Sequence, residues 1–179
     1  MKAKLRYKIG DKIIAKIAHK RKRKLGIPNY PESKNLLFIL DENTLSNSTL
    51  IDAFERKLIA EGKQIHRLIF FNKTKNIPAE KLDNTTFISR KDLTLWGSPK
   101  TKQCKKIINT SYDFAINLDM NGEESLNSLI SLSKAVCRVG YFRSNKSVRC
   151  YDLSIGLQEN TYTFPNFLTD IDTYLHRIQ

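Results

Sequence analysis

The stretch from Tyr112 to Phe142 constrains the fold of this chain more than any other part of the sequence. It begins with a short apolar run at 112–118, continues with apolar residues at helical spacing over 123–134, and ends in a second apolar run at 136–142. Strand, helix and strand in about 30 residues form a βαβ unit, which requires a parallel sheet. The stretch therefore predicts an α/β fold.

The same pattern recurs earlier in the chain. Apolar runs at 35–41 and 65–71 flank a predicted helix at 50–61. Four side chains of this helix are expected to face the core: Leu50, Phe54, Leu58 and Ile59. The remaining predicted elements are a strand at 85–89, a basic helix at 102–109, a strand at 151–157 and a helix starting at Thr163. We predict one Rossmann-like three-layer domain over residues 35–179, with a mostly parallel sheet of five or six strands and helices on both faces.

Positive charge is concentrated before this domain. Residues 1–25 contain eleven Lys or Arg residues and one acid, whereas residues 26–179 contain 20 basic and 17 acidic residues. Isoleucines at helical spacing predict an amphipathic helix in residues 1–25, and residues 26–34, with two prolines, form a linker. The helix either packs its apolar stripe on the domain or binds an anionic partner, and the two roles are compatible. The candidate anion-binding residues are Lys12, Lys16, Lys20, Arg21, Lys22, Arg23 and Lys24.

RNA, including the ribosome, is the partner that this charge favours, bound mainly through phosphate contacts. An anionic membrane surface is an alternative, because the isoleucine stripe suits the acyl boundary of a bilayer. No apolar run approaches the roughly 20 residues that a transmembrane helix needs, and no secretory signal is recognisable. We therefore expect a cytoplasmic protein without a transmembrane segment, and the sequence does not indicate its oligomeric state.

Motifs for nucleotide binding, nucleophilic catalysis and metal binding are missing from the sequence. No GxGxxG, GxxxxGK[ST] or HExxH pattern occurs, and the histidines are dispersed at 19, 66 and 176. The three cysteines fit a reducing compartment, although a disulfide between Cys137 and Cys150 is geometrically conceivable. The single tryptophan, Trp96, is interpreted as a core or edge anchor, with ligand stacking as the alternative. We expect neither a metal nor a cofactor.

Polar residues that follow the predicted strands are the remaining candidates for a site, because ligands of open parallel sheets bind at the carboxyl ends of the strands. These residues are Asp41, Glu42, Asn72, Asp119, Asn121 and Gly122. The two aspartates suit acid–base chemistry or metal binding. Alternatively, each residue serves only its own turn or helix start, as Asp and Asn commonly do.

Two resemblances add to this interpretation. The basic first helix, the RKDLTLWG segment at 90–97, YDFAINL at 112–118 and SLSKAVCRVGY at 131–141 resemble an uncharacterised family of small Bacteroidota proteins. In addition, residues 112–144 are similar to the N-terminal Rossmann-like domain of heptosyltransferase-like glycosyltransferases. This second resemblance concerns a packing motif rather than catalytic residues, and the second, nucleotide-sugar-binding domain of those enzymes has no counterpart here.

The sequence leads to one main functional hypothesis and two alternatives. The main hypothesis is a non-catalytic cytoplasmic α/β protein whose basic arm docks on RNA or the ribosome. One alternative is a glycosyltransferase-like enzyme, or a remnant of one, that binds a nucleotide-sugar or a phosphorylated ligand. The other alternative is a protein bound to the surface of a membrane.

Overall fold

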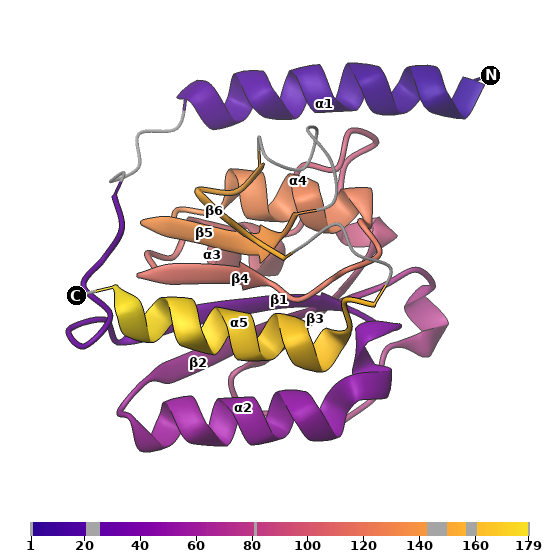
Figure 1. Cartoon of the computed structure of the whole chain (residues 1–179). Coiled ribbons are helices and arrows are strands. Elements are labelled where there is room, and N and C mark those ends of the chain that lie inside the picture. The colour runs from indigo at the N-terminus through magenta and orange to yellow at the C-terminus, as the bar shows by residue number, and fades with distance from the viewer. Residues whose placement is uncertain (1, 21–25, 81, 143–149, 157–160, 179) are drawn as a thin grey trace.

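The centre of the structure, a computed structural model, is a six-stranded sheet. The structure describes the backbone of residues 2–20, 26–80, 82–142, 150–156 and 161–178. It also describes the side chains of these residues, except those of residues 2–9 and 11. The strands are β1 (Asn35–Asp41), β2 (Gln64–Phe71), β3 (Thr85–Ser89), β4 (Phe114–Asn117), β5 (Cys137–Tyr141) and β6 (Leu153–Ile155). They lie in the order β3-β2-β1-β4-β5-β6, and every neighbouring pair is parallel (Figure 1). The predicted α/β sheet is confirmed, with six strands.

Helices cover both faces of the sheet. They are α1 (Lys2–Lys20), α2 (Ser48–Ala60), α3 (Lys102–Asn109), α4 (Glu124–Leu132) and α5 (Phe164–Arg177). Helices α2 and α5 share one hydrophobic cluster with the sheet, and α3 and α4 share the other. Helix α1 lies outside α4 (Figure 1), so this side of the molecule has one layer more than a simple three-layer fold.

Strand β1 shows why the sheet needs cover on both faces. Leu36, Phe38 and Leu40 belong to the cluster under α2 and α5, whereas Leu37 and Ile39 belong to the cluster under α3 and α4. Successive side chains of a strand point to opposite faces, so a continuous apolar run can only be buried between two layers of helices. The residues at 36–40 are all apolar for this reason.

Helix α2 corrects one prediction. Leu50 and Ile59 were expected to face inward, but they are 41% and 55% exposed, and Ile51 is buried instead. The helix starts at Ser48, and Ile51, Phe54 and Leu58 follow at steps of three and four residues, which places them on one face. Leu50 and Ile59 each lie one residue away from this stripe.

Helix α1 packs on the domain through the middle of its apolar stripe. Ile14 is 6% exposed and joins the cluster formed by α3, α4 and the sheet, and Ile17 and Ala18 contact the edge of this cluster. Burying an isoleucine stabilises by about 1.5–3 kcal/mol relative to leaving it exposed. The packing alternative for the basic helix is therefore realised in the structure.

The segment predicted as a linker is held against the domain. Tyr30 is buried, its hydroxyl donates to Glu61 Oε2 at 2.5 Å, and its backbone N–H donates to the carbonyl of Ile178 at 3.1 Å. The buried Lys63 ammonium donates to the carbonyls of Tyr30 (2.6 Å) and Ser33 (2.8 Å). These contacts join the beginning of the domain to the end of α5.

Candidate functional site

The carboxyl edge of the sheet brings together the two aspartates that the sequence singled out. Asp41 ends β1 and Asp119 follows β4, and these two strands are neighbours at the point where the strand order reverses. Ligands of doubly wound sheets typically bind at such a point. Asp41 and Asp119 are 2% and 3% exposed, so any role in binding depends on whether their oxygens are available.

Both aspartates use their oxygens in local hydrogen bonds. Asp41 Oδ1 accepts from the backbone N–H (2.9 Å) and hydroxyl (2.6 Å) of Thr44, and Asp41 Oδ2 accepts from the Asn43 amide at 2.8 Å. Asp119 accepts from the backbone N–H groups of Asn121 and Glu123. Burial raises the pKa of Asp119, and the nearby Asp41 carboxylate raises this pKa further. These contacts support the interpretation as turn and helix-start residues.

The other polar residues of this edge are also engaged locally. Glu42 accepts from the Asn72 backbone N–H at 3.2 Å and from the Asn76 amide at 2.9 Å, and the Asn76 contact is the main reason why the pKa of Glu42 is lowered. Gly122 has a φ of 80°, which favours glycine. A pocket built by Asp41, Glu42, Asn72, Asp119, Asn121 and Gly122 stays a prediction. Within the described residues, no group of three or more His, Cys, Asp or Glu side chains is placed to hold a metal ion.

The cysteines behave as packing residues. The conceivable disulfide between Cys137 and Cys150 is not formed, and Cys104 and Cys137 are buried. Burial raises the pKa of the Cys104 thiol to about 12. A thiol with a raised pKa is a poor nucleophile because the thiolate is the reactive form.

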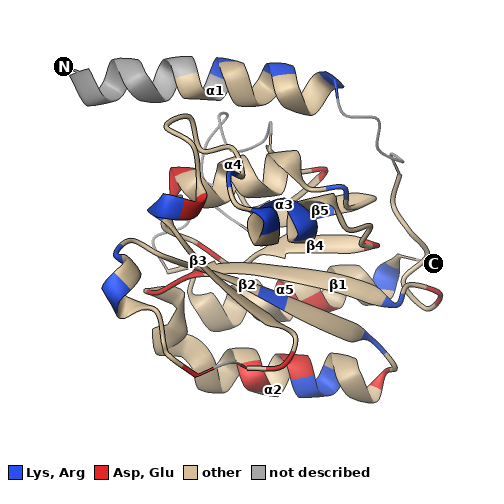
Figure 2. Ribbon diagram, turned by 180° about the vertical axis from the view of Figure 1, so that it is seen from behind, with Lys and Arg blue, Asp and Glu red and all other residues tan. Residues whose placement is uncertain are grey.

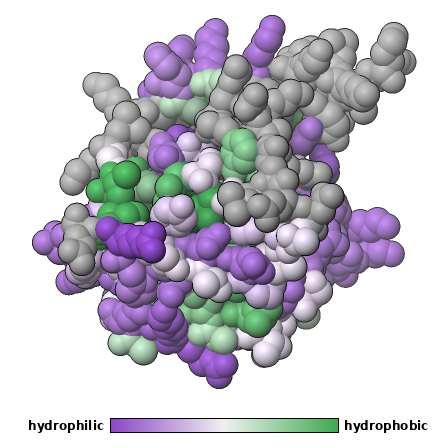
Figure 3. Space-filling model, viewed as in Figure 1, coloured by the Kyte–Doolittle hydropathy of each residue, from purple (hydrophilic) through white to green (hydrophobic). Residues whose placement is uncertain are grey.

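Exposed lysines line the outer side of α1. Lys12, Lys16 and Lys20 are exposed and follow one another at four-residue steps, about 6 Å apart along the helix axis. Figure 2 shows blue Lys and Arg segments along the ribbon of α1, and Figure 3 shows hydrophilic groups projecting from the same edge of the molecule. Arg21, Lys22, Arg23 and Lys24 lie outside the described residues.

A second group of lysines lies on α3, which the sequence analysis recognised as basic but did not include in the site. Lys102, Lys105 and Lys106 are exposed, and Cys104, Ile107 and Ile108 point into the core. The amphipathic pattern of this helix was the signal for this placement. Helices α1 and α3 both contact α4 and lie on the same side of the sheet (Figure 2).

We call these six residues, Lys12, Lys16, Lys20, Lys102, Lys105 and Lys106, the cationic face. Their two helices contain one acid in total, Asp11. On the opposite side of the sheet, α2 and α5 contain four acidic residues and three Lys or Arg residues. The positive charge of the chain is thus concentrated on one side of the fold. Helix α4, between the two lysine groups, adds one acid, Glu124.

Comparisons with known proteins identify a family for this chain but no activity. Residues 2–178 match a protein family of unknown function. No curated protein and no solved structure matches the chain. No helix among the described residues is long and apolar enough to cross a membrane.

Proposed function

The chain belongs to the DUF6913 family, a family of unknown function, and we propose that it is a non-catalytic RNA-binding protein that uses the cationic face. The observation that carries the proposal is the exposed row of Lys12, Lys16 and Lys20 on a helix that already buries Ile14 against the domain. RNA phosphates are the partner that such a row suits, because binding to them releases counterions and needs no shaped pocket.

The docking of α1 favours RNA over a membrane surface. A helix that lies in a bilayer inserts its apolar side chains between lipids. Ile14 is 6% exposed and packs with α4, and Ile17 contacts the same cluster. Membrane binding would require this contact to be broken, whereas phosphate binding uses only the lysines that are already exposed.

The hydrogen bonds of the strand-end carboxylates weaken the case for an enzyme. Asp41 and Asp119 each accept hydrogen bonds on both oxygens from their own turns. A general base or a metal ligand needs an oxygen that is free to meet the substrate or ion. The glycosyltransferase-like alternative therefore receives no support from this edge of the sheet.

We infer that the RNA is cytoplasmic and that the ribosome, the largest store of accessible RNA, is the first partner to test. Binding would be largely independent of sequence, because lysine contacts with phosphates carry no sequence information. If each lysine of the cationic face neutralises one phosphate of a single strand, the slope of log K against log salt is about −4.

The experiment measures binding of the full chain to a fluorescein-labelled oligouridylate by fluorescence anisotropy. The measurement is repeated at salt concentrations between about 50 and 200 mM. The test variant combines Lys12→Gln, Lys16→Gln and Lys20→Gln. It should bind more weakly and reduce the magnitude of the slope by about 2. A second triple variant, at Lys102, Lys105 and Lys106, should have a similar effect.

The matched control removes the same charge elsewhere. Arg56, Lys73 and Lys75 are exposed and lie outside the cationic face, so their replacement by Gln should leave the slope almost unchanged. The proposal fails if the wild-type chain does not bind RNA at low salt. It also fails if the control variant loses as much affinity as the test variants, because net charge alone would then explain binding. Cosedimentation with ribosomes in low salt, compared between the same variants, tests whether the ribosome is the RNA partner.

A further inference from the structure

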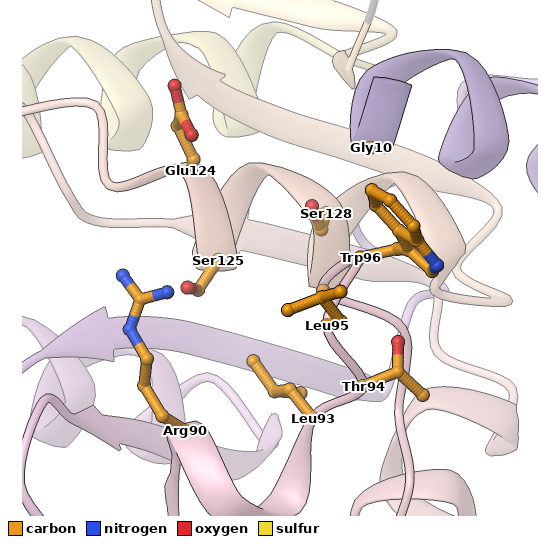
Figure 4. Close-up of a pocket in the computed structure, with 10 residues that line it drawn as sticks. Gly10, Arg90, Leu93, Thr94, Leu95, Trp96, Glu124, Ser125 and Ser128 are labelled. Atoms are coloured by element: carbon orange, nitrogen blue, oxygen red, sulfur yellow. The ribbon is translucent and has the colours of Figure 1, made fainter. Parts of the chain in front are cut away.

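A cleft of about 310 Å³ lies where the loop after β3 meets the first turns of α4. Arg90 and residues 93–97 form one side, Ser125 and Ser128 of α4 form the other, and Gly10 of α1 contributes to the rim (Figure 4). None of the residues predicted from the strand ends lines this cleft. The cleft is also separate from the lysines of the cationic face.

One end of the cleft presents two hydrogen-bond donors, the Ser125 hydroxyl and the Arg90 guanidinium. Arg90 has an ion pair with Glu123 but no hydrogen bond among the described residues. Ser125 is 6% exposed, and its hydroxyl makes no hydrogen bond within the part of the chain that the structure describes. The Arg90 guanidinium and the Ser125 hydroxyl point toward one another across the cleft (Figure 4). The nearest carboxylate to Arg90 is Glu123 Oε1 at 3.8 Å, which is too far for a hydrogen bond.

The acidic residues Glu123 and Glu124 lie beside the Arg90 end of the cleft but do not fill it. Glu123 Oε1 accepts a hydrogen bond from the Ser125 backbone N–H at 3.1 Å, so this carboxylate serves the start of α4. The Glu124 side chain points away from Arg90 and Ser125 (Figure 4). A guanidinium and a nearly buried hydroxyl that face the same space are suited to a carboxylate or phosphate group.

The other end of the cleft is apolar. Leu93 is buried at its base, Leu95 is 59% exposed, and the indole of Trp96 is partly buried beside them. Trp96 belongs to neither hydrophobic cluster of the domain. It is therefore not a core anchor. The edge-anchor role and the ligand-stacking alternative stay predictions, and Trp96 lines the cleft.

We propose that this cleft binds a small organic anion. Its acidic group, a carboxylate or a phosphate, contacts the Arg90 guanidinium and the Ser125 hydroxyl, and its apolar or aromatic part lies against Leu95 and Trp96. A volume of about 310 Å³ is at the lower end of the range for ligand pockets. The proposal does not depend on RNA binding, because it uses different residues.

Trp96 provides the measurement, since it is the only tryptophan of the chain. Its fluorescence is followed while the full protein is titrated with phenyl phosphate, with phenylacetate, and with the neutral 2-phenylethanol. A saturable change is expected with at least one of the two anions and not with the alcohol. The anion that binds more tightly identifies the acidic group.

Two variants test the assigned contacts. Arg90→Gln should weaken binding of the anion by about tenfold or more, as expected for the loss of a hydrogen bond to a charged group. Ser125→Ala should weaken it by a few fold and leave the urea midpoint unchanged, because the hydroxyl makes no hydrogen bond within the described residues. Lys91→Gln removes an adjacent exposed charge that does not line the cleft and should have no effect.

Three outcomes would overturn the proposal. The first is that neither anion changes the fluorescence of Trp96 in the wild-type protein. The second is that 2-phenylethanol binds as tightly as the anions, and the third is that Arg90→Gln binds the anion as the wild type does. RNA binding by the lysine variants is measured separately, so failure here leaves the RNA proposal to its own test.

Discussion

The side-chain amide of Asn117 donates a 2.8 Å hydrogen bond to the hydroxyl of Tyr151 inside the protein. The same hydroxyl donates to Asn127 Oδ1 at 3.0 Å. Asn117 is the last residue of β4, Asn127 lies on α4, and Tyr151 precedes β6. Three segments that are distant in the sequence are therefore joined by one hydroxyl group.

The first prediction concerns this hydroxyl. Tyr151→Phe keeps the ring but leaves the fully buried Asn117 amide without its acceptor, and we expect a loss of about 1–3 kcal/mol in the free energy of unfolding. Urea denaturation measures the change. Tyr174→Phe is the control, because Tyr174 is 45% exposed and should be nearly neutral. Equal stability of the two variants would show that the network contributes nothing.

Gly140 gives the second prediction. A Cβ atom at this position would lie 2.2 Å from the ring of Tyr151, so Gly140→Ala cannot be accommodated without moving the ring or the strand. We expect a destabilisation of about 1–3 kcal/mol, as for other overpacked cores. Gly26→Ala is the matched control, since nothing lies within 4 Å of a Cβ atom there. A Gly140→Ala variant with an unchanged urea midpoint would contradict the close approach.

The third prediction is a dependence of stability on pH. Burial lowers the pKa of His66, and the positive charge of Lys106 lowers it further. The unfolded chain therefore binds a proton at His66 more tightly than the folded protein does. The contribution to stability is fully present above the unfolded pKa of about 6.5 and is lost as the pH falls through the lower, folded pKa.

The measurement compares urea midpoints of the wild type and His66→Gln at neutral and mildly acidic pH. The wild type should lose more stability on acidification than the variant. His19→Gln serves as the control, because the His19 side chain is exposed on α1. Parallel losses in the wild type and in His66→Gln would rule out His66 as the titrating group.

The fourth prediction concerns the anchor of the segment at 26–34. Lys63→Met keeps the aliphatic stem but leaves the carbonyls of Tyr30 and Ser33 without their shared donor. We expect a loss of about 1–3 kcal/mol and faster cleavage by protease within residues 26–34. Lys34→Met, at an exposed side chain of the same segment, should do neither. Unchanged cleavage of Lys63→Met would mean that other contacts hold the segment.

The sequence was sufficient to predict the sheet because its strands are continuous apolar runs. The β1 strand was predicted with its observed bounds, and β4 lies within the apolar run predicted at 112–118. The phase of α2 was less certain from sequence, because Leu50 and Ile51 are adjacent and equally apolar. Only the start of the helix at Ser48 decides which of them faces the core.

The cleft residues were beyond the reach of the sequence for a different reason. Arg90 follows β3 and Ser125 lies on α4, and their approach depends on the order of the strands and on the loop that carries Trp96. Neither residue belongs to a motif of fixed spacing. By contrast, the lysines of α3 were predictable, because the buried face of an amphipathic helix determines which residues are exposed.

The packing of α1 on α4 has a consequence for how the chain folds during its synthesis. Helix α1 is synthesised before α4, on which it packs and which is complete only after residue 132. Helix α1 is therefore made before α4 but can pack in its final position only after α4 has been made. While the chain grows, Ile14 and the neighbouring lysines are uncovered together beside ribosomal RNA. The nascent helix thus meets a polyanion before it meets its own domain, and completion of α4 closes the apolar stripe.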